Sequence, residues 1–126
     1  MKNFSNYIAG LVIISLAVLM PSCVSDQISP KEIIVPETVS FSGDIIPIFD
    51  ASCNFQGCHS TNGIPPDLTP EAAWVNLVYL NYVDTVTTEN SILWKKIDTG
   101  GSMEQYVTDQ DKALILSWIE QDAPEN

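Results

Sequence analysis

Apolar and polar positions follow a helical period in several stretches of the chain after residue 40. The first covers residues 42–52, where the inward positions are apolar: Ile45, Ile48 and Phe49. Ser42 or Asp44 can cap this helix, and Pro47 is tolerated in the first turn, where its missing N–H is not needed. The pattern predicts a short amphipathic helix that ends beside Cys53.

Three further stretches have helical character. Thr69-Pro70-Glu71 is typical of a helix start, with an N-cap hydroxyl, a proline at the first helical position and an acid near the positive end of the helix dipole. Residues 89–97 predict a helix with three inward side chains: Ile92, Leu93 and Ile97. Thr108 and Asp111 resemble a capping box for a last helix. Its apolar stripe is Leu114, Ile115, Trp118 and Ile119.

Long loops separate these helices. Residues 54–68 and 98–103 are rich in Gly, Asn, Ser, Thr and Pro, and residues 79–87 fit either a loop or a short extended piece. The sequence therefore predicts an all-α domain of about four short helices. Loops of this length in a small domain usually serve a function, and here they flank both Cys58 and Met103.

The amino-terminal segment predicts export. Residues 8–20 form an apolar or small run without charge, too short to span a bilayer comfortably but typical of a secretory signal. Leu19-Met20-Pro21-Ser22-Cys23 resembles a bacterial lipobox, which would make Cys23 the lipidated first residue of the mature protein. We expect residues 1–22 to be a lipoprotein signal peptide, with a plain cleaved signal or a retained anchor as the alternatives. Residues 23–40 are expected to form a flexible tether and residues 41–126 the folded domain. The predicted location is a bacterial membrane surface facing the periplasm or the cell exterior.

The charge balance is strongly acidic. The chain carries 16 Asp and Glu residues against 5 Lys and Arg residues, for a net charge of −11 at pH 7, and it contains no arginine. A basic stripe for phosphate backbones is missing, which argues against nucleic-acid binding. Dense negative charge either favours partners with basic docking surfaces or serves solubility alone.

The most informative segment is Cys53-Asn54-Phe55-Gln56-Gly57-Cys58-His59. Two cysteines followed at once by a histidine indicate covalent attachment of a c-type haem. The two thiols add to the porphyrin vinyl groups, and the adjacent imidazole turns to reach the iron. Four residues separate the cysteines instead of the usual two, and Gly57 relaxes the backbone where the spacer must turn.

Other interpretations of the same residues remain open. A Cys53–Cys58 disulfide suits an exported protein, which would then be a haem-free structural or binding lipoprotein. A zinc site would lack an obvious fourth ligand. Thioredoxin-like chemistry requires two residues between the cysteines and a strand–helix context. A Cys–His nucleophile pair has no identifiable orienting partner.

The chain resembles the small monohaem c-type cytochrome domains of bacterial lipoproteins. The similarity covers residues 41–126 and includes the helix before Cys53, the Cys58-His59 pair and the closing Leu114-to-Pro124 segment. It implies a cytochrome c-like fold, one covalent haem c and iron ligation by a Met in the loop before the last helix. Met103 occupies that place. The chain departs from the pattern in its wide cysteine spacing and in Glu104, where a proline is common.

Elimination among the residues also favours Met103. His59 is the only histidine, and Met1 and Met20 would leave with the signal peptide, so Met103 leads the candidates for a second strong iron ligand. Three lysines stand behind it: Lys95, Lys96 and Lys112. The resemblance also implies that a proline in the loop after the haem motif supplies a carbonyl for the second imidazole nitrogen. Pro65 and Pro66 are the candidates, and either could instead serve only to stiffen the loop. Four side chains either line the haem or belong to the plain core: Leu68, Trp74, Ile97 and Trp118.

These patterns predict an electron-transfer protein rather than an enzyme. The expected cofactor-binding residues are Cys53, Cys58, His59 and Met103, with His59 and Met103 as ligands of the haem iron. A thioether ligand suits electron transfer because it raises the reduction potential relative to two histidines. Peroxidase-like activity would need a distal acid–base residue, and no second histidine is present. The expected partners are redox proteins and, through the lipid anchor, a membrane.

Overall fold

The first helical segment begins earlier than the sequence pattern indicates. The structure is a computed structural model that describes residues 31–126. In it the Ser40 hydroxyl, rather than Ser42 or Asp44, accepts a hydrogen bond from the N–H of Gly43 (3.0 Å). The Asp44 carboxylate in turn accepts from the N–H of Ser40 (2.8 Å). This reciprocal pair satisfies two donors that a helix start leaves free.

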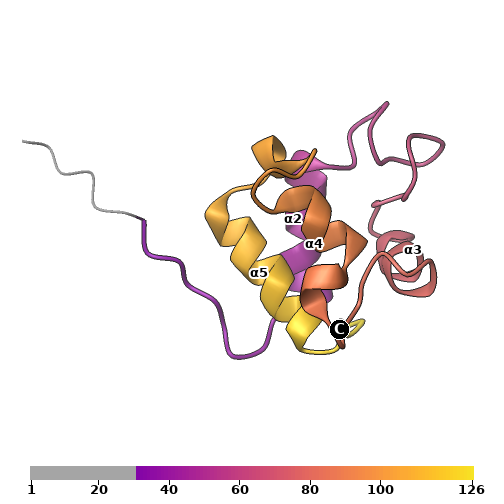
Figure 1. The fold of residues 1–126 in the computed structure, drawn as a ribbon. Helices are drawn as coiled ribbons and strands as arrows, with labels where there is room; N and C mark the ends of the chain where they lie inside the picture. The colour runs from indigo at the N-terminus through magenta and orange to yellow at the C-terminus, as the bar shows by residue number, and fades with distance from the viewer. Residues whose placement is uncertain (1–30) are drawn as a thin grey trace, which may run out of the picture. The chain divides into compact units, whose positions relative to one another are not determined.

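Residues 32–126 form one unit, and its regular elements are all helical. In chain order they are η1 (Phe41–Ile45, a π-helical turn), α2 (Ile46–Ser52), α3 (Ala73–Tyr79), η2 (Thr88–Asn90), α4 (Ile92–Ile97), η3 (Glu104–Tyr106) and α5 (Asp109–Glu120). No β-strand occurs in the part of the chain that the structure describes, so the predicted all-α class is confirmed. α5 packs against η1 and α4, and Figure 1 shows α3 to one side of them.

The predicted helix start at Thr69 is wrong. The α-helix begins at Ala73, with Ala72 at the N-cap and no side-chain cap. Thr69 instead begins a turn, in which its carbonyl accepts from the N–H groups of Ala72 and Ala73 (3.0 and 2.8 Å). The Thr69 hydroxyl and N–H both donate to the carboxylate of Asp67 (2.7 and 3.0 Å). These hydrogen bonds hold the pKa of the Asp67 carboxyl below its usual range, and the bond from the hydroxyl has the larger effect.

The expected helix over residues 89–97 is interrupted at Ser91. The Ser91 side chain is buried, and its hydroxyl accepts from the N–H of Asp84 (2.8 Å) and donates to the Asp84 carbonyl (3.2 Å). These bonds hold the Ser91 backbone at ψ 129°, outside the helical range, which separates η2 from α4. Leu93 and Ile97 face inward as predicted, whereas Ile92 is 43% exposed.

The last helix forms as predicted. The Thr108 hydroxyl accepts from the N–H of Asp111 (3.2 Å), and the Asp111 carboxylate accepts from the N–H of Thr108 (2.8 Å), which completes the capping box. The inward face of α5 is buried at three positions: Ile115, Trp118 and Ile119. Leu114, the fourth residue of the predicted stripe, is partly buried against the core.

Trp118 lies at the centre of the core. It is fully buried, and its ring centroid is 5.1 Å from that of Phe41. Its indole N–H donates to the Pro124 carbonyl (3.0 Å), and the indole of Trp74 donates to the neighbouring Ala123 carbonyl (2.9 Å). Both indoles are thus satisfied by the segment after α5, which returns to cover the core.

An extended segment precedes η1 and is held along α5 by two glutamines. The Gln110 amide makes a reciprocal pair of hydrogen bonds with the backbone of Ile34 (2.9 and 2.6 Å). The Gln121 side chain accepts from the N–H of Val39 (3.0 Å), whose side chain is fully buried. The last residues of the expected tether therefore pack against the domain.

The predicted signal peptide and Cys23 lie outside the described residues. Among the helices of residues 31–126, none combines the length and apolarity needed to cross a membrane.

Candidate functional site

One cavity of about 510 Å³ brings together the four residues that the sequence singled out. Cys53, Cys58, His59 and Met103 all line it, although Met103 is more than forty residues away along the chain. The cavity lies between the end of α2, the loop that follows α2, α4 and the segment from Ser102 to Val107. Its volume is within the range of sites for small molecules and cofactors.

The inner wall of the cavity is the apolar core. It is made of buried side chains from four helices and one loop: Phe49, Leu68, Leu77, Leu93, Ile97 and Ile115. The rim carries large apolar side chains that are each about half exposed: Phe55, Ile64, Ile92 and Tyr106. Contact of both surfaces with a large apolar ligand would be favourable, because it would remove apolar area from water.

Two backbone carbonyls orient the His59 ring. The Nδ1 atom lies 2.9 Å from the carbonyl oxygen of Ile64 and 3.1 Å from that of Pro66. A carbonyl can only accept, so Nδ1 must carry the proton, and the neutral ring keeps its lone pair on Nε2. Nε2 makes no hydrogen bond within the described residues, which leaves it available as a metal ligand.

The loop that supplies these carbonyls requires a glycine at position 63. The N–H of Gly63 donates to the Ser60 carbonyl (2.7 Å), and the N–H of Ile64 donates to the Cys58 carbonyl (2.6 Å). A Cβ atom on Gly63 would lie 2.2 Å from the Cys58 oxygen. This close backbone approach brings the Ile64 carbonyl round to the imidazole of His59.

The wide spacer between the cysteines is folded back on itself. The N–H of Cys58 donates to the Phe55 carbonyl (2.8 Å), and the N–H of His59 donates to the Cys53 carbonyl (3.1 Å). Gly57 lies inside this turn at φ +85°, a conformation that favours glycine. Four residues are therefore looped out, and both cysteines still line one cavity.

The two thiols are free and differ in environment. Cys53 is half-buried at the end of α2, whereas Cys58 is exposed. Burial, with smaller effects of the negative charges of Asp111 and Cys58, raises the pKa of the Cys53 thiol to about 11. Without a bound group, Cys53 is thus a neutral thiol at ordinary pH. Within residues 31–126, no three His, Cys, Asp or Glu side chains converge as a metal-ion site.

The Met103 backbone is anchored to the end of α4. Its N–H donates to the Lys96 carbonyl (2.7 Å), and the preceding turn is closed by a bond from Gly101 N–H to the Asp98 carbonyl (2.8 Å). A Cβ atom on Gly101 would lie 2.3 Å from the Lys96 oxygen. Glycine at this position therefore lets the loop pass close to α4, with Met103 in the cavity wall.

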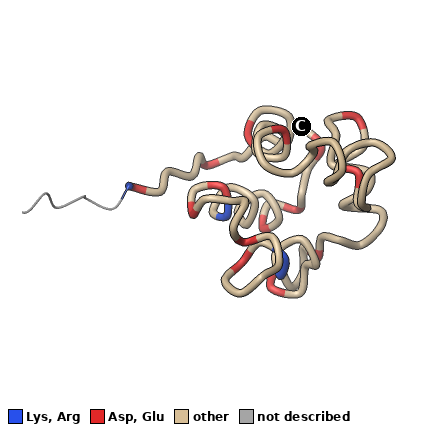
Figure 2. Tube along the Cα trace, turned by 90° about the horizontal axis from the view of Figure 1, so that it is seen from above, with Lys and Arg blue, Asp and Glu red and all other residues tan. Residues whose placement is uncertain are grey.

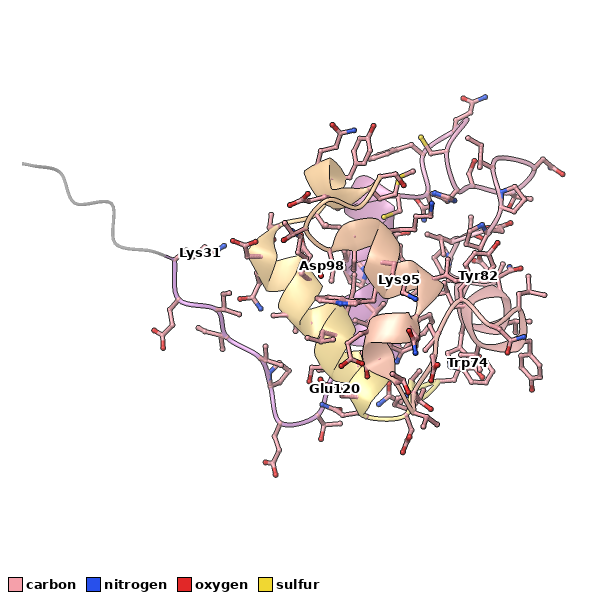
Figure 3. All side chains as sticks on the ribbon, viewed as in Figure 1. Lys31, Trp74, Tyr82, Lys95, Asp98 and Glu120 are labelled. Carbon is pink, nitrogen blue, oxygen red and sulfur yellow. The ribbon has the colours of Figure 1, made fainter. Side chains whose placement is uncertain are left out.

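The other candidates from the sequence separate into two groups. Leu68, Ile97 and Lys96 line the cavity, whereas Trp74, Trp118, Lys95 and Lys112 do not. Figure 3 shows Lys95 on α4 and Trp74 on the α3 side of the domain. The two tryptophans instead hold the carboxyl-terminal segment through their indole N–H groups.

Acidic residues are spread over the whole described chain, as Figure 2 shows, and lysines occur at few places. Lys96 is the only cationic side chain among the residues that line the cavity. The sequence did not predict the contact between the Ile64 carbonyl and His59, because a backbone carbonyl leaves no trace in residue type.

These observations fit a large, mostly apolar group that carries a metal. The walls are apolar, one imidazole is oriented with a free Nε2 atom, a thioether side chain is in the wall, and two thiols are within the same site. Comparison of the chain with protein-family models, with curated protein sequences and with solved structures finds no match.

Proposed function

We propose that this protein is an electron carrier with one covalently attached haem c and a cytochrome c-like fold. Cys53 and Cys58 would hold the porphyrin through thioether bonds, and His59 and Met103 would ligate the iron. The haem supplies the one-electron redox chemistry when it is bound, while the chain supplies ligation, burial and orientation.

The observation that carries this proposal is the orientation of His59. Two carbonyls fix the Nδ1–H tautomer and leave Nε2 free, and the adjacent residue is one of two cysteines in an apolar cavity. The Met103 thioether in the same cavity supports ligation by one nitrogen and one sulfur atom, which suits electron transfer.

Intact mass spectrometry tests the proposal. The full-length gene should be expressed in a host that matures c-type cytochromes, and the product should gain the mass of one haem with both thiols consumed. Its colour should survive denaturation and acid–organic extraction. In the Cys53→Ser and Cys58→Ser variants the haem should be held by one bond or lost. Ser60→Ala, at a half-buried serine whose side chain makes no hydrogen bond within the described residues, should behave as the parent.

A different mass would support the other candidate. A haem-free product two hydrogens lighter than the reduced chain would indicate a Cys53–Cys58 disulfide and a structural or binding role. This outcome would overturn the haem proposal, because two cysteines joined in a disulfide cannot form thioether bonds to a haem.

We further propose that the protein is exported and anchored to a bacterial membrane through a lipidated Cys23. Support comes from the charge-free apolar run over residues 8–20 and the small residue before Cys23. Stable anchoring needs more than one acyl chain. Cys23→Ser removes the thiol that would be lipidated, so it should release the protein into the soluble fraction or block processing. An intact leader in purified membranes would contradict the proposal.

The acidic surface suits redox partners with basic docking surfaces. Attraction between exposed opposite charges weakens with salt, since the Debye length falls to a few ångströms at molar ionic strength. The rate of electron exchange with a basic partner protein should fall as salt is added, and exchange with an acidic partner should not. A salt-independent rate would indicate that the charge serves solubility alone.

A further inference from the structure

Glu104 directly follows Met103, and its side chain folds back over the loop that carries this methionine. One carboxylate oxygen accepts a hydrogen bond from the backbone N–H of Gly100 at 2.7 Å. The other oxygen pairs with the ammonium of Lys112 in the first turns of α5 at 3.4 Å. Both oxygens are thus used, and they connect the start of the loop to the helix that follows it.

The Gly100 N–H depends on this carboxylate. Gly100 has φ +82°, and its N–H makes no other hydrogen bond within the described residues. The backbone of Glu104 closes the same turn from the other side, because its N–H donates to the Gly101 carbonyl (3.2 Å). The side-chain bond to Gly100 and the backbone bond to Gly101 therefore close residues 100–104 into a small ring, and Met103 is one of the residues in this ring.

Lys112 gives the ring a rigid support. Its side chain is 14% exposed, and its backbone N–H donates to Thr108 in the first turn of α5. α5 is itself capped by Thr108 and Asp111 and packed on the core. The ion pair between the Lys112 ammonium and the Glu104 carboxylate, at 3.4 Å, therefore connects the loop to a helix whose position is fixed.

We propose that Glu104 is a positioning residue that fixes the Met103 loop against α5 and so keeps the thioether in the cavity wall. The relevance of this role to iron ligation rests on the proposed function, whereas the conformation of the loop does not. Glu104 supplies through two bonds the rigidity that a proline would supply through its ring.

Four variants separate the contributions. Glu104→Ala removes both bonds, and Glu104→Gln keeps an acceptor for Gly100 but loses the charge. Lys112→Met keeps an apolar stem of similar length and removes the ion pair. The matched control is Glu120→Ala, because Glu120 is exposed, makes no side-chain hydrogen bond or ion pair within the described residues, and lies at the opposite end of α5 from η3 (Figure 3).

Hydrogen–deuterium exchange of the full chain as purified measures the loop directly. Peptides that cover residues 99–105 should exchange about tenfold faster in Glu104→Ala, with smaller increases in Glu104→Gln and Lys112→Met and none in Glu120→Ala. The near-infrared charge-transfer band of an iron–methionine bond should weaken in the same order, while the haem stays covalently attached.

The two proposals fail in different ways. If the parent protein carries haem but lacks the near-infrared band, Met103 ligation is wrong, and the exchange data still decide the role of Glu104. If exchange over residues 99–105 is the same in Glu104→Ala as in the parent, the positioning role of Glu104 is overturned, whatever the spectrum shows. Equal acceleration in Glu120→Ala would also overturn it, because the effect would then be a general one of lost charge.

Discussion

The Nδ1 atom of His59 lies 3.1 Å from the carbonyl oxygen of Pro66, seven residues further along the chain. The same nitrogen also approaches the Ile64 carbonyl, so a single N–H is shared between two acceptors. Pro66 is buried, and the backbone N–H of Leu68 binds the His59 carbonyl (2.7 Å), which closes the loop on both sides of the imidazole. The ring orientation is therefore set by backbone atoms of the loop.

Two glycines near the site should respond differently to substitution by alanine. Gly63→Ala places a Cβ atom 2.2 Å from a backbone oxygen, which cannot give way cheaply, and should destabilise the protein by about 2–3 kcal/mol. Gly57→Ala meets no atom within 4 Å but has φ +85°, so it should cost only about 1 kcal/mol. Denaturant unfolding measures both values. Equal costs would show that the 58–64 loop relaxes around the added methyl group.

Replacement of Met103 with alanine should leave the haem attached, because attachment depends on Cys53 and Cys58. The variant should have a lower reduction potential, bind carbon monoxide or cyanide, and lose the near-infrared band. Voltammetry and absorption spectroscopy measure these changes. If the parent already binds carbon monoxide quickly and the variant is unchanged, the sixth position is open, and a small-molecule-binding or peroxidase-like role becomes the better proposal.

The two thiols of haem-free protein should differ in their response to pH. Cys53 has a pKa of about 11, raised by burial, so its reaction with iodoacetamide should be slow at pH 8 and accelerate as the pH approaches 11. Cys58 is exposed and should react first. The raised pKa also makes folding stability depend on pH. The contribution of the protonated Cys53 thiol to stability is fully present below pH 9, the pKa of an unburied thiol, and is lost as the pH rises towards 11. Peptide mapping after timed labelling identifies the order, and simultaneous labelling at pH 8 would contradict it.

The extended segment before η1 should contribute to stability through Gln121 and Gln110. Gln121→Ala removes hydrogen bonds to the buried Val39 backbone and to the Ser117 hydroxyl, and should cost about 1 kcal/mol or more. Gln110→Ala breaks an exposed pair with Ile34 and should cost less. Gln105→Ala, at an exposed position without a side-chain hydrogen bond in the described residues, is the control. Chemical denaturation of the three variants gives the order.

The sequence predicted the elements whose signals are local. The capping box of Thr108 and Asp111 and the apolar stripe of α5 are contained within one helix, and both are present. The start of α3 was misplaced because Thr69 begins a turn, in which the N–H groups of Ala72 and Ala73 bond to its carbonyl, and its hydroxyl accepts no N–H group from the helix. The break at Ser91 depends on a contact with Asp84, seven residues away, which no periodicity reveals.

In the candidate site, too, the sequence predicted the features with local signals and did not predict those that depend on the path of the chain. Adjacent residues in the sequence identified Cys58 and His59, and composition singled out Met103, since few residues of its type are present. Which of Pro65 and Pro66 presents a carbonyl to the imidazole depends on the path of the loop, and the structure selects Pro66. The proposed contribution of Glu104 depends on the convergence of Gly100, four residues earlier, and Lys112, eight residues later, on its carboxylate, and residue types do not reveal this convergence.

The half-exposed apolar rim has a consequence for how the protein would mature in a cell. Phe55, Ile64, Ile92 and Tyr106 together present a hydrophobic surface around the cavity mouth, of the kind that chaperones and proteases recognise on incomplete chains. A covalently bound apolar group would cover this surface permanently, since thioether bonds do not dissociate. Chains that receive the group would therefore escape degradation, and chains that miss it would be removed, so the steady-state amount of protein would report how well maturation supplies the group.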